Sequence, residues 1–143
     1  ARMRFDLLVS DFTLAATRDR KIVIFGEQFW RPFVHVADIA AAFQRVLEAS
    51  PELVSGQVFN VGMNANNCQK LQLAELVQSH VPGTEIETVR RDHDPRSYRV
   101  EFAKIARVLD YTPAWTVEDG VRECRDALQS GLWRDPSDAR YTN

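Results

Sequence analysis

The stretch that decides the fold runs from residue 30 to residue 38 and reads WRPFVHVAD. Its apolar residues predict a short strand over residues 32–36. Aspartate is a preferred helix N-cap, so Asp38 predicts a helix from Ile39 to Ala49. Arg31 stands at the start of this strand-to-helix unit. Its guanidinium group is a planar fork of donors that stays charged at physiological pH and fits a phosphate.

A second arginine, Arg91, opens a polar loop that reads RDHDPRSY over residues 91–98. Two arginines can hold adjoining phosphates, so the pair predicts a diphosphate site. Ion pairing within the chain is the simpler alternative for each of them: Arg31 with Asp38 or Glu27, and Arg91 with Asp92 or Asp94. Arginines outnumber the acids around the loop, and this unbalanced charge favours binding of an external anion.

Composition limits the classes of function that are open to the chain. Its 143 residues, 45% of them hydrophobic and 27% charged, suit one globular domain with a core. The formal net charge of −2 creates no field that collects nucleic acid or an anionic membrane, so an anion site must be a local pocket. Two cysteines, Cys68 and Cys124, form neither a metal cluster nor a disulfide framework, and a reducing, cytoplasmic setting is expected. No apolar run approaches the roughly 20 residues that cross a bilayer.

Apolar periodicity and turn residues predict a small α/β fold with short strands and about four helices. Strands are expected over residues 21–25, 32–36, 57–61 and 84–89. Helices are expected over residues 5–16, 39–49, 102–109, around Leu71 to Val77, and after the capping-box-like residues 116–119. We expect residues 1–130 to form one lobe and residues 131–143 to be a tail that wraps the surface or is disordered.

Other chemistry-bearing side chains suit structural roles better than catalytic ones. His35 lies between two valines, where a structural histidine bonded to a nearby carboxylate is favoured over a catalytic base. Cys68 stands at an expected helix start, which favours a thiolate, but a packing or capping role is favoured because it has no partner cysteine. Four aromatic residues can stack on a nucleobase or belong to the core: Phe29, Trp30, Phe33 and Tyr98. The chain has no glycine-rich dinucleotide fingerprint and no Tyr-x-x-x-Lys pair.

In its order of motifs, the chain resembles the C-terminal, substrate-binding part of the NAD-dependent nucleotide-sugar epimerase/dehydratase family, the extended short-chain dehydrogenases/reductases. RPFVHVADIA (residues 31–40) resembles the family's Arg-x-(Phe/Tyr)-(Val/Ile)-His-Val-x-Asp motif and is the most specific match. The other matching stretches are residues 2–12, FNVG at 59–62, and a closing pattern that takes in residues 91–98, Lys104, 109–113 and 118–121. Together they cover nearly the whole chain.

The resemblance implies a set of substrate-binding residues. It implies that Arg31 and Arg91 contact the diphosphate of a nucleotide sugar and that Phe33 lies near the nucleotide. It also implies that Asp94 bonds the ribose or orients an arginine. Tyr98, which lies in the family's closing pattern, is the fifth candidate, as a ring that stacks or closes over the ligand.

The function expected from the resemblance is nucleotide-diphosphate-sugar binding within an NAD(P)-dependent sugar epimerase or dehydratase. The family's Rossmann domain and catalytic tyrosine and lysine are absent from this sequence, so we expect no catalytic residue and no bound cofactor in this chain, with NAD(P) held by a full-length parent. We therefore expect a fragment of such an enzyme. The alternative is a stand-alone binding or self-association module, a homo-oligomer formed through exposed apolar surface, chiefly the helix over residues 5–16.

Overall fold

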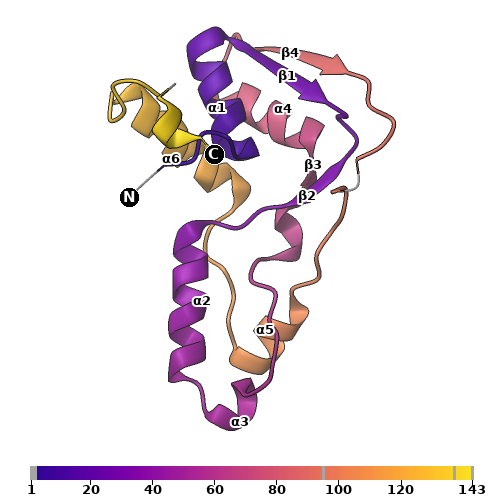
Figure 1. The fold of residues 1–143 in the computed structure, drawn as a ribbon, viewed down its shortest axis with the longest axis vertical. Coiled ribbons are helices and arrows are strands. Elements are labelled where there is room, and N and C mark those ends of the chain that lie inside the picture. Colours follow the sequence, from indigo (N-terminus) through magenta and orange to yellow (C-terminus); the bar gives the residue numbers. More distant parts are fainter. Residues whose placement is uncertain (1–2, 95, 137, 143) are drawn as a thin grey trace. The chain divides into compact units, whose positions relative to one another are not determined.

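A computed structural model describes residues 3–94, 96–136 and 138–142 (Figure 1). The chain folds as two compact units. Unit 1 takes in the described residues of Ala1–Phe29, Gln69–Pro95 and Glu118–Asn143, and unit 2 takes in Trp30–Cys68 and Arg96–Val117. The predicted class, a small α/β fold with short strands, is confirmed.

Unit 1 is built on two parallel strands, β1 (Lys21–Phe25) and β4 (Glu85–Val89), paired from Lys21 with Glu85 to Phe25 with Val89. Both strands were predicted, and both are rich in the β-branched residues that suit a half-buried sheet. Ile22 and Ile24 on β1 are almost fully buried, whereas Val23 and Phe25 point outward. The sheet therefore has one core face and one exposed face.

Three helices belong to unit 1: α1 (Leu8–Asp19), α4 (Lys70–His80) and most of α6 (Val117–Gln129). Their buried residues include Phe12, Leu73, Val77, Val121 and Cys124. The helix predicted over residues 5–16 lies three residues further on, and it ends where Arg20 adopts a left-handed conformation with φ 54°. The positions of the other two helices follow the prediction.

The tail beyond residue 131 wraps onto unit 1 where the structure describes it. A short 3₁₀ helix, η2 (Ala139–Tyr141), ends close to Phe5, whose N–H donates to the Tyr141 carbonyl at 2.9 Å. The Phe5 ring also meets Trp133 edge to face, with ring centroids 5.1 Å apart. The division into a lobe over residues 1–130 and a tail over residues 131–143 stays a prediction.

Unit 2 contains two very short paired strands, β2 (Trp30–Pro32) and β3 (Asn67–Gln69), the latter leading out of the unit at its last residue. Its helices are α2 (Val36–Glu48), the single turn α3 (Pro51–Val54), the 3₁₀ turn η1 (Asn64–Asn66) and α5 (Ala103–Leu109). The unit's core is formed by Ala42, Ile105, Leu109 and Tyr111, with Val46, Phe59 and Val61 packed against it.

Three sequence predictions in unit 2 are wrong. The strand lies at Trp30–Pro32 rather than at 32–36, because its pairing partner β3 lies opposite the residues that precede Phe33. The following helix begins at Val36 rather than Ile39, because His35 and not Asp38 is its N-cap. Residues 57–61 are extended but form no strand, since no neighbouring strand pairs with them among the residues described.

No helix in the described part of the chain is both long and apolar enough to cross a membrane.

Candidate functional site

Arg31 links two segments of unit 2 through its side chain. Its Nη1 donates to the carbonyl oxygens of Trp30 and Arg96, each at 2.7 Å. The first carbonyl belongs to β2 and the second to the chain that leads to Tyr98. The guanidinium group is half-buried there and holds the 96–98 segment against the strand.

Tyr98 and Phe33 lie on the segments that Arg31 joins. The Tyr98 N–H donates to the Trp30 carbonyl at 3.4 Å, and the Trp30 N–H donates to Ser97 Oγ at 3.2 Å. The Tyr98 side chain is 53% exposed, so its ring is accessible to a ligand. Phe33 is half-buried and donates its N–H to the Asn66 carbonyl at 3.0 Å. The structure thus brings the predicted residues Arg31, Phe33 and Tyr98 onto neighbouring backbone segments.

Arg99 and Trp30 form a pair beside them. The guanidinium carbon of Arg99 lies 4.7 Å from the centroid of the Trp30 ring, a cation–π contact. Arg99 is exposed and forms no ion pair with any carboxylate in the described part of the chain. The excess of arginine around the loop was the available signal, but it did not indicate which arginine stays without a carboxylate.

The histidine and aspartate of the RPFVHVAD stretch serve the scaffold. His35 Nδ1 accepts the Ala37 N–H at 3.2 Å, and its ring stacks on Trp115 with centroids 4.2 Å apart. Asp38 is 3% exposed, and its carboxylate accepts the N–H groups of Ala114 at 2.8 Å and Trp115 at 3.2 Å. These two side chains therefore fix the start of α2 against the 111–115 segment, and the bond to a carboxylate that was predicted for His35 stays a prediction.

In unit 2, asparagine side chains form hydrogen bonds with the main chain of neighbouring segments. Asn66 Nδ2 donates to the Trp115 carbonyl at 3.0 Å, and Asn67 exchanges hydrogen bonds with the main chain of Val100 at 2.8 and 3.0 Å. Asn64 Oδ1 accepts the Phe102 N–H at 3.1 Å. Side-chain amides can pair with a backbone as another strand would, so these residues hold the segments around β2 and Tyr98 in place.

Arg91 lies in unit 1, next to the turn that closes β1. The Gly26 N–H donates to the Val89 carbonyl at 3.0 Å, and Gln28 Nε2 donates to the Arg91 carbonyl at 2.8 Å. The Arg91 guanidinium group is exposed and has no ion-pair partner among the residues described. Its two sequence neighbours are engaged elsewhere: Asp92 with Arg90 at 2.8 Å, and Asp94 with Lys70 at 3.4 Å.

Asp94 is buried rather than open to solvent. Its side chain is 2% exposed, and its Oδ2 faces Lys70 Nζ, which also donates to the Phe25 carbonyl at 2.9 Å and lies 5.6 Å from the Phe29 ring centroid. A buried charge pair of this kind costs stability when one partner is removed, so it fixes the geometry of the loop base. A ribose contact for Asp94 stays a prediction. Lys70 was missed because a single lysine at a helix start forms no sequence pattern.

The five predicted residues fall into the two units: Arg31, Phe33 and Tyr98 in unit 2, and Arg91 and Asp94 in unit 1. That the two guanidinium groups meet on one diphosphate stays a prediction. No group of three or more potential metal ligands occurs in the described ranges. Cys68 lies in β3 and not at a helix start, and burial raises the pKa of its thiol to about 11, so the predicted packing role fits better than a thiolate.

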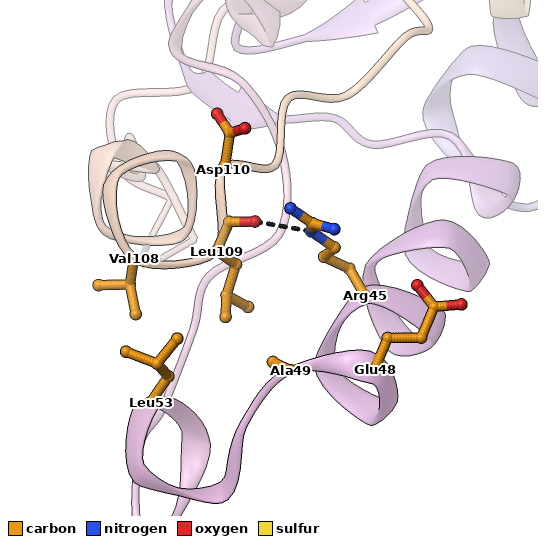
Figure 2. Close-up of a pocket in the computed structure, with 7 residues that line it drawn as sticks. All are labelled: Arg45, Glu48, Ala49, Leu53, Val108, Leu109 and Asp110. Atoms are coloured by element: carbon orange, nitrogen blue, oxygen red, sulfur yellow. Dashed lines mark hydrogen bonds between the residues drawn. The ribbon is translucent and has the colours of Figure 1, made fainter.

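A pocket in unit 2 contains none of the predicted residues (Figure 2). It has a volume of about 210 Å³ and lies between the end of α2, α3 and the end of α5. Arg45 Nε donates to the Leu109 carbonyl across its rim at 2.7 Å. We assign no ligand to this pocket.

Comparison with known proteins gives a consistent family relationship. Residues 6–62 match the NAD dependent epimerase/dehydratase family, a range that includes the RPFVHVAD stretch. The low-salt glycan biosynthesis protein Agl12 of Haloferax volcanii is 29% identical over 130 residues, which are 87% of this chain and 40% of the relative. The dTDP-L-rhamnose 4-epimerase of Burkholderia thailandensis is 26% identical over 121 residues, 82% of this chain and 32% of the relative.

The fold is shared with solved structures as well. The UDP-glucose 4-epimerase of Thermotoga maritima, solved with UDP-glucose, superposes with a TM-score of 0.72 at 22% identity, covering 89% of this chain and 40% of that one. The chain is therefore related to the NAD-dependent epimerase/dehydratase family, and it spans well under half the length of the relatives it matches.

Proposed function

We propose that this chain is the nucleotide-diphosphate-sugar-binding portion of an NAD(P)-dependent sugar epimerase or dehydratase. The family relationship supports the class, and the names of two relatives contain a nucleotide sugar, dTDP-L-rhamnose in one and UDP-glucose in the other. Within this proposal, Arg31 and Arg91 contact the diphosphate, Phe33 and Tyr98 contact the nucleoside, and Asp94 supports the Arg91 loop.

The observation that carries the proposal is the state of Arg91. Ion pairing with Asp92 or Asp94 was the simpler alternative, yet Arg90 engages the first carboxylate and Lys70 the second. An exposed arginine beside two carboxylates that are engaged elsewhere keeps its charge available for an external anion.

We assign the hydride-transfer chemistry of the reaction to none of the residues described here. NAD(P) supplies hydride acceptance and return in enzymes of this class. The residues described here do not fit that cofactor: β1 runs through the Gly26 turn to β2, and no strand leads through a glycine-rich loop to a helix N-terminus. We therefore derive no reaction step through the cofactor, and the contribution of this chain is to bind and orient the substrate.

Titration calorimetry with UDP and dTDP tests the proposal. We expect weak binding, with a dissociation constant of about 10 μM to 1 mM, because a partial site recovers only part of the binding energy. Arg91→Ala should weaken binding roughly tenfold or more, the cost of about 1.4 kcal/mol or more expected for a charge-assisted phosphate contact. Arg31→Ala should do the same, with Arg31→Lys intermediate because lysine keeps the charge but not the fork.

Arg107→Ala is the matched control, since Arg107 is exposed near the end of α5 and its loss changes the net charge equally. Its affinity should equal that of the parent chain. Unchanged UDP affinity in both Arg31→Ala and Arg91→Ala, on samples with parental circular dichroism, would show that the diphosphate assignment is wrong.

A further inference from the structure

Lys70 occupies a position that local physical chemistry disfavours for a cation. It is the first residue of α4, where the positive end of the helix dipole repels an ammonium group, and its side chain is only 9% exposed. Burial of a charge costs free energy unless hydrogen-bonding and charged partners offset it. Residues that break such local preferences are expected at functional or strained sites, so we looked at what Lys70 holds in place.

The contacts of Lys70 connect three segments of unit 1. Its Nζ donates to the Phe25 carbonyl at the end of β1 at 2.9 Å, and it lies 3.4 Å from Asp94 Oδ2. Its main-chain N–H donates to the Phe29 carbonyl at 3.1 Å. The ammonium group therefore joins the end of β1 to the far end of the 91–94 loop.

A chain of two hydrogen bonds holds the near end of the same loop. Gln69, the N-cap of α4, donates from Nε2 to the Gln28 carbonyl at 3.1 Å. Gln28 in turn donates from its own Nε2 to the Arg91 carbonyl at 2.8 Å. Two consecutive residues at the start of α4 thus fix the loop at Arg91 and at Asp94, while the Arg91 guanidinium group stays exposed.

A buried ion pair is a poor source of net stability, which favours positioning as the role of Lys70 and Asp94. The attraction between two buried charges barely offsets the loss of their hydration, and apolar replacement of such pairs often leaves a protein equally stable. What these contacts provide is a loop whose main chain is ordered before a ligand arrives. Binding to a preorganised cation avoids the entropy cost of ordering the loop.

We propose that Lys70 and Gln69, the latter through Gln28, are positioning residues that hold Arg91 in place for the diphosphate of a nucleotide. Their effect on nucleotide affinity is exerted through Arg91 alone, and neither side chain is assigned a contact with the ligand. This inference rests on the proposed function. It goes beyond that function by assigning part of the affinity to two side chains at the start of a helix, which hold the loop from both ends.

Titration of the 143-residue chain with UDP, followed by NMR so that millimolar dissociation constants can be measured, tests the two contacts separately. Lys70→Met keeps the length of the side chain and should weaken UDP binding about tenfold, close to the cost of ordering one loop residue. Gln28→Ala removes one bond to the Arg91 carbonyl at an exposed residue and should weaken binding about threefold. Gln129→Ala, at an exposed residue of α6, is the matched control and should keep the parental affinity.

Lys70→Met leaves the buried Asp94 carboxylate without the ammonium group, so the double variant Lys70→Met/Asp94→Asn is a second test that removes both charges. It should fold with the circular dichroism of the parent chain, yet its UDP affinity should still be about tenfold lower. Hydrogen–deuterium exchange of the 91–94 amides should be at least about fivefold faster in it. Val121→Ala, at a fully buried residue of α6, should lower stability and leave UDP affinity unchanged.

The Arg91→Ala background distinguishes positioning from a general effect on the fold. Because the two contacts act through Arg91, adding Lys70→Met/Asp94→Asn to Arg91→Ala should change UDP affinity less than about twofold. An equal loss of affinity in both backgrounds would overturn the inference and leave the proposed function intact, and so would parental affinity in the double variant or in Gln28→Ala. UDP binding that Arg91→Ala leaves unchanged would refute the proposed contact of Arg91 and the positioning role with it.

Discussion

At the scale of single residues, Gly26 determines the turn that leads from β1 toward the predicted site. Its φ is +70°, and a Cβ atom there would lie 2.4 Å from the Phe29 ring and 3.3 Å from Arg91 Cβ. Any side chain at this position meets both a disfavoured backbone conformation and a ring in the core. The turn that places Arg91 therefore requires glycine.

Gly26→Ala should lower the free energy of unfolding by about 3 kcal/mol or more, measured by urea denaturation. Gly83→Ala measures the backbone part separately, because Gly83 has a φ of +83° but nothing within 4 Å of the added carbon. Its cost should be about 1 kcal/mol, the backbone contribution alone. Equal costs for the two variants would contradict the steric explanation.

The two thiols should be unreactive in the folded chain. Burial raises the pKa of Cys68 to about 11, and burial, with a smaller contribution from Glu123, raises that of Cys124 to about 12. The thiolate is the reactive form, so at pH 8 only about 0.1% of Cys68 is reactive, and its alkylation rate should rise tenfold per pH unit while the fold persists. Iodoacetamide labelling followed by peptide mapping measures this. A Cys68 rate equal to that of the urea-unfolded chain at pH 8 would show that the thiol is not desolvated.

Sequence could predict residues whose role follows a recognisable pattern, and not those whose role comes from packing. Arg31 was predicted because it starts a strand-to-helix stretch, and Arg91 because it opens a polar loop in which arginines outnumber acids; their phosphate contacts stay predictions. Lys70 was not found, because its pairing with Asp94 depends on β1, α4 and the 91–94 loop lying together, which no local pattern records. The stacking of His35 on Trp115 was not predicted, because it joins residues far apart in the chain.

At the scale of elements, Asp38 connects the first turn of α2 to the 111–115 segment through three hydrogen bonds. Its carboxylate accepts two N–H groups, and its carbonyl accepts the Tyr111 hydroxyl at 2.6 Å. Asp38→Ala should lower the free energy of unfolding by about 2–4 kcal/mol, since it leaves buried N–H groups unpaired. Asp38→Asn keeps one acceptor oxygen and should cost less.

Urea denaturation measures both changes, with Glu48→Ala as a control on the exposed side of the same helix. That control should stay within about 0.5 kcal/mol of the parent chain. A parental stability for Asp38→Ala would mean that the carboxylate does not hold the two segments together.

Strands that pair with each other in the described part of the chain were predicted well, whereas the 57–61 segment and the start of α2 were not. β1 and β4 pair with each other within the chain, and both were located from the pattern of their apolar residues. The 57–61 segment has an equally good strand pattern, yet a strand needs hydrogen bonds to a neighbouring strand, and none of the strands in the described ranges pairs with it. The start of α2 was misplaced because aspartate was weighted above histidine as an N-cap, although the carboxylate of Asp38 is used elsewhere.

At the scale of the whole molecule, the predicted site residues divide between the two units, and the division corresponds to different local designs. In unit 1, a parallel strand pair and a buried Lys70–Asp94 contact hold a loop from which Arg91 projects. In unit 2, side-chain amides and Asp38 hold short segments on which Arg31, Phe33 and Tyr98 lie. In both units these contacts hold the backbone segments on which the predicted residues lie.

The chain by itself should bind a nucleotide sugar without converting it. Hydride transfer requires a bound acceptor and a positioned acid or base, and we assign neither role to any described residue. Incubation with UDP-glucose and NAD, analysed by chromatography and by absorbance at the wavelength of NADH, should yield neither an epimer nor reduced cofactor above a protein-free control. Saturation-transfer NMR on the same mixture should still show contact between UDP-glucose and the chain, and Arg91→Ala should reduce that signal. Turnover by the parent chain that Arg91→Ala abolishes would mean that these 143 residues contain a catalytic centre, and the division between binding and chemistry would have to be abandoned.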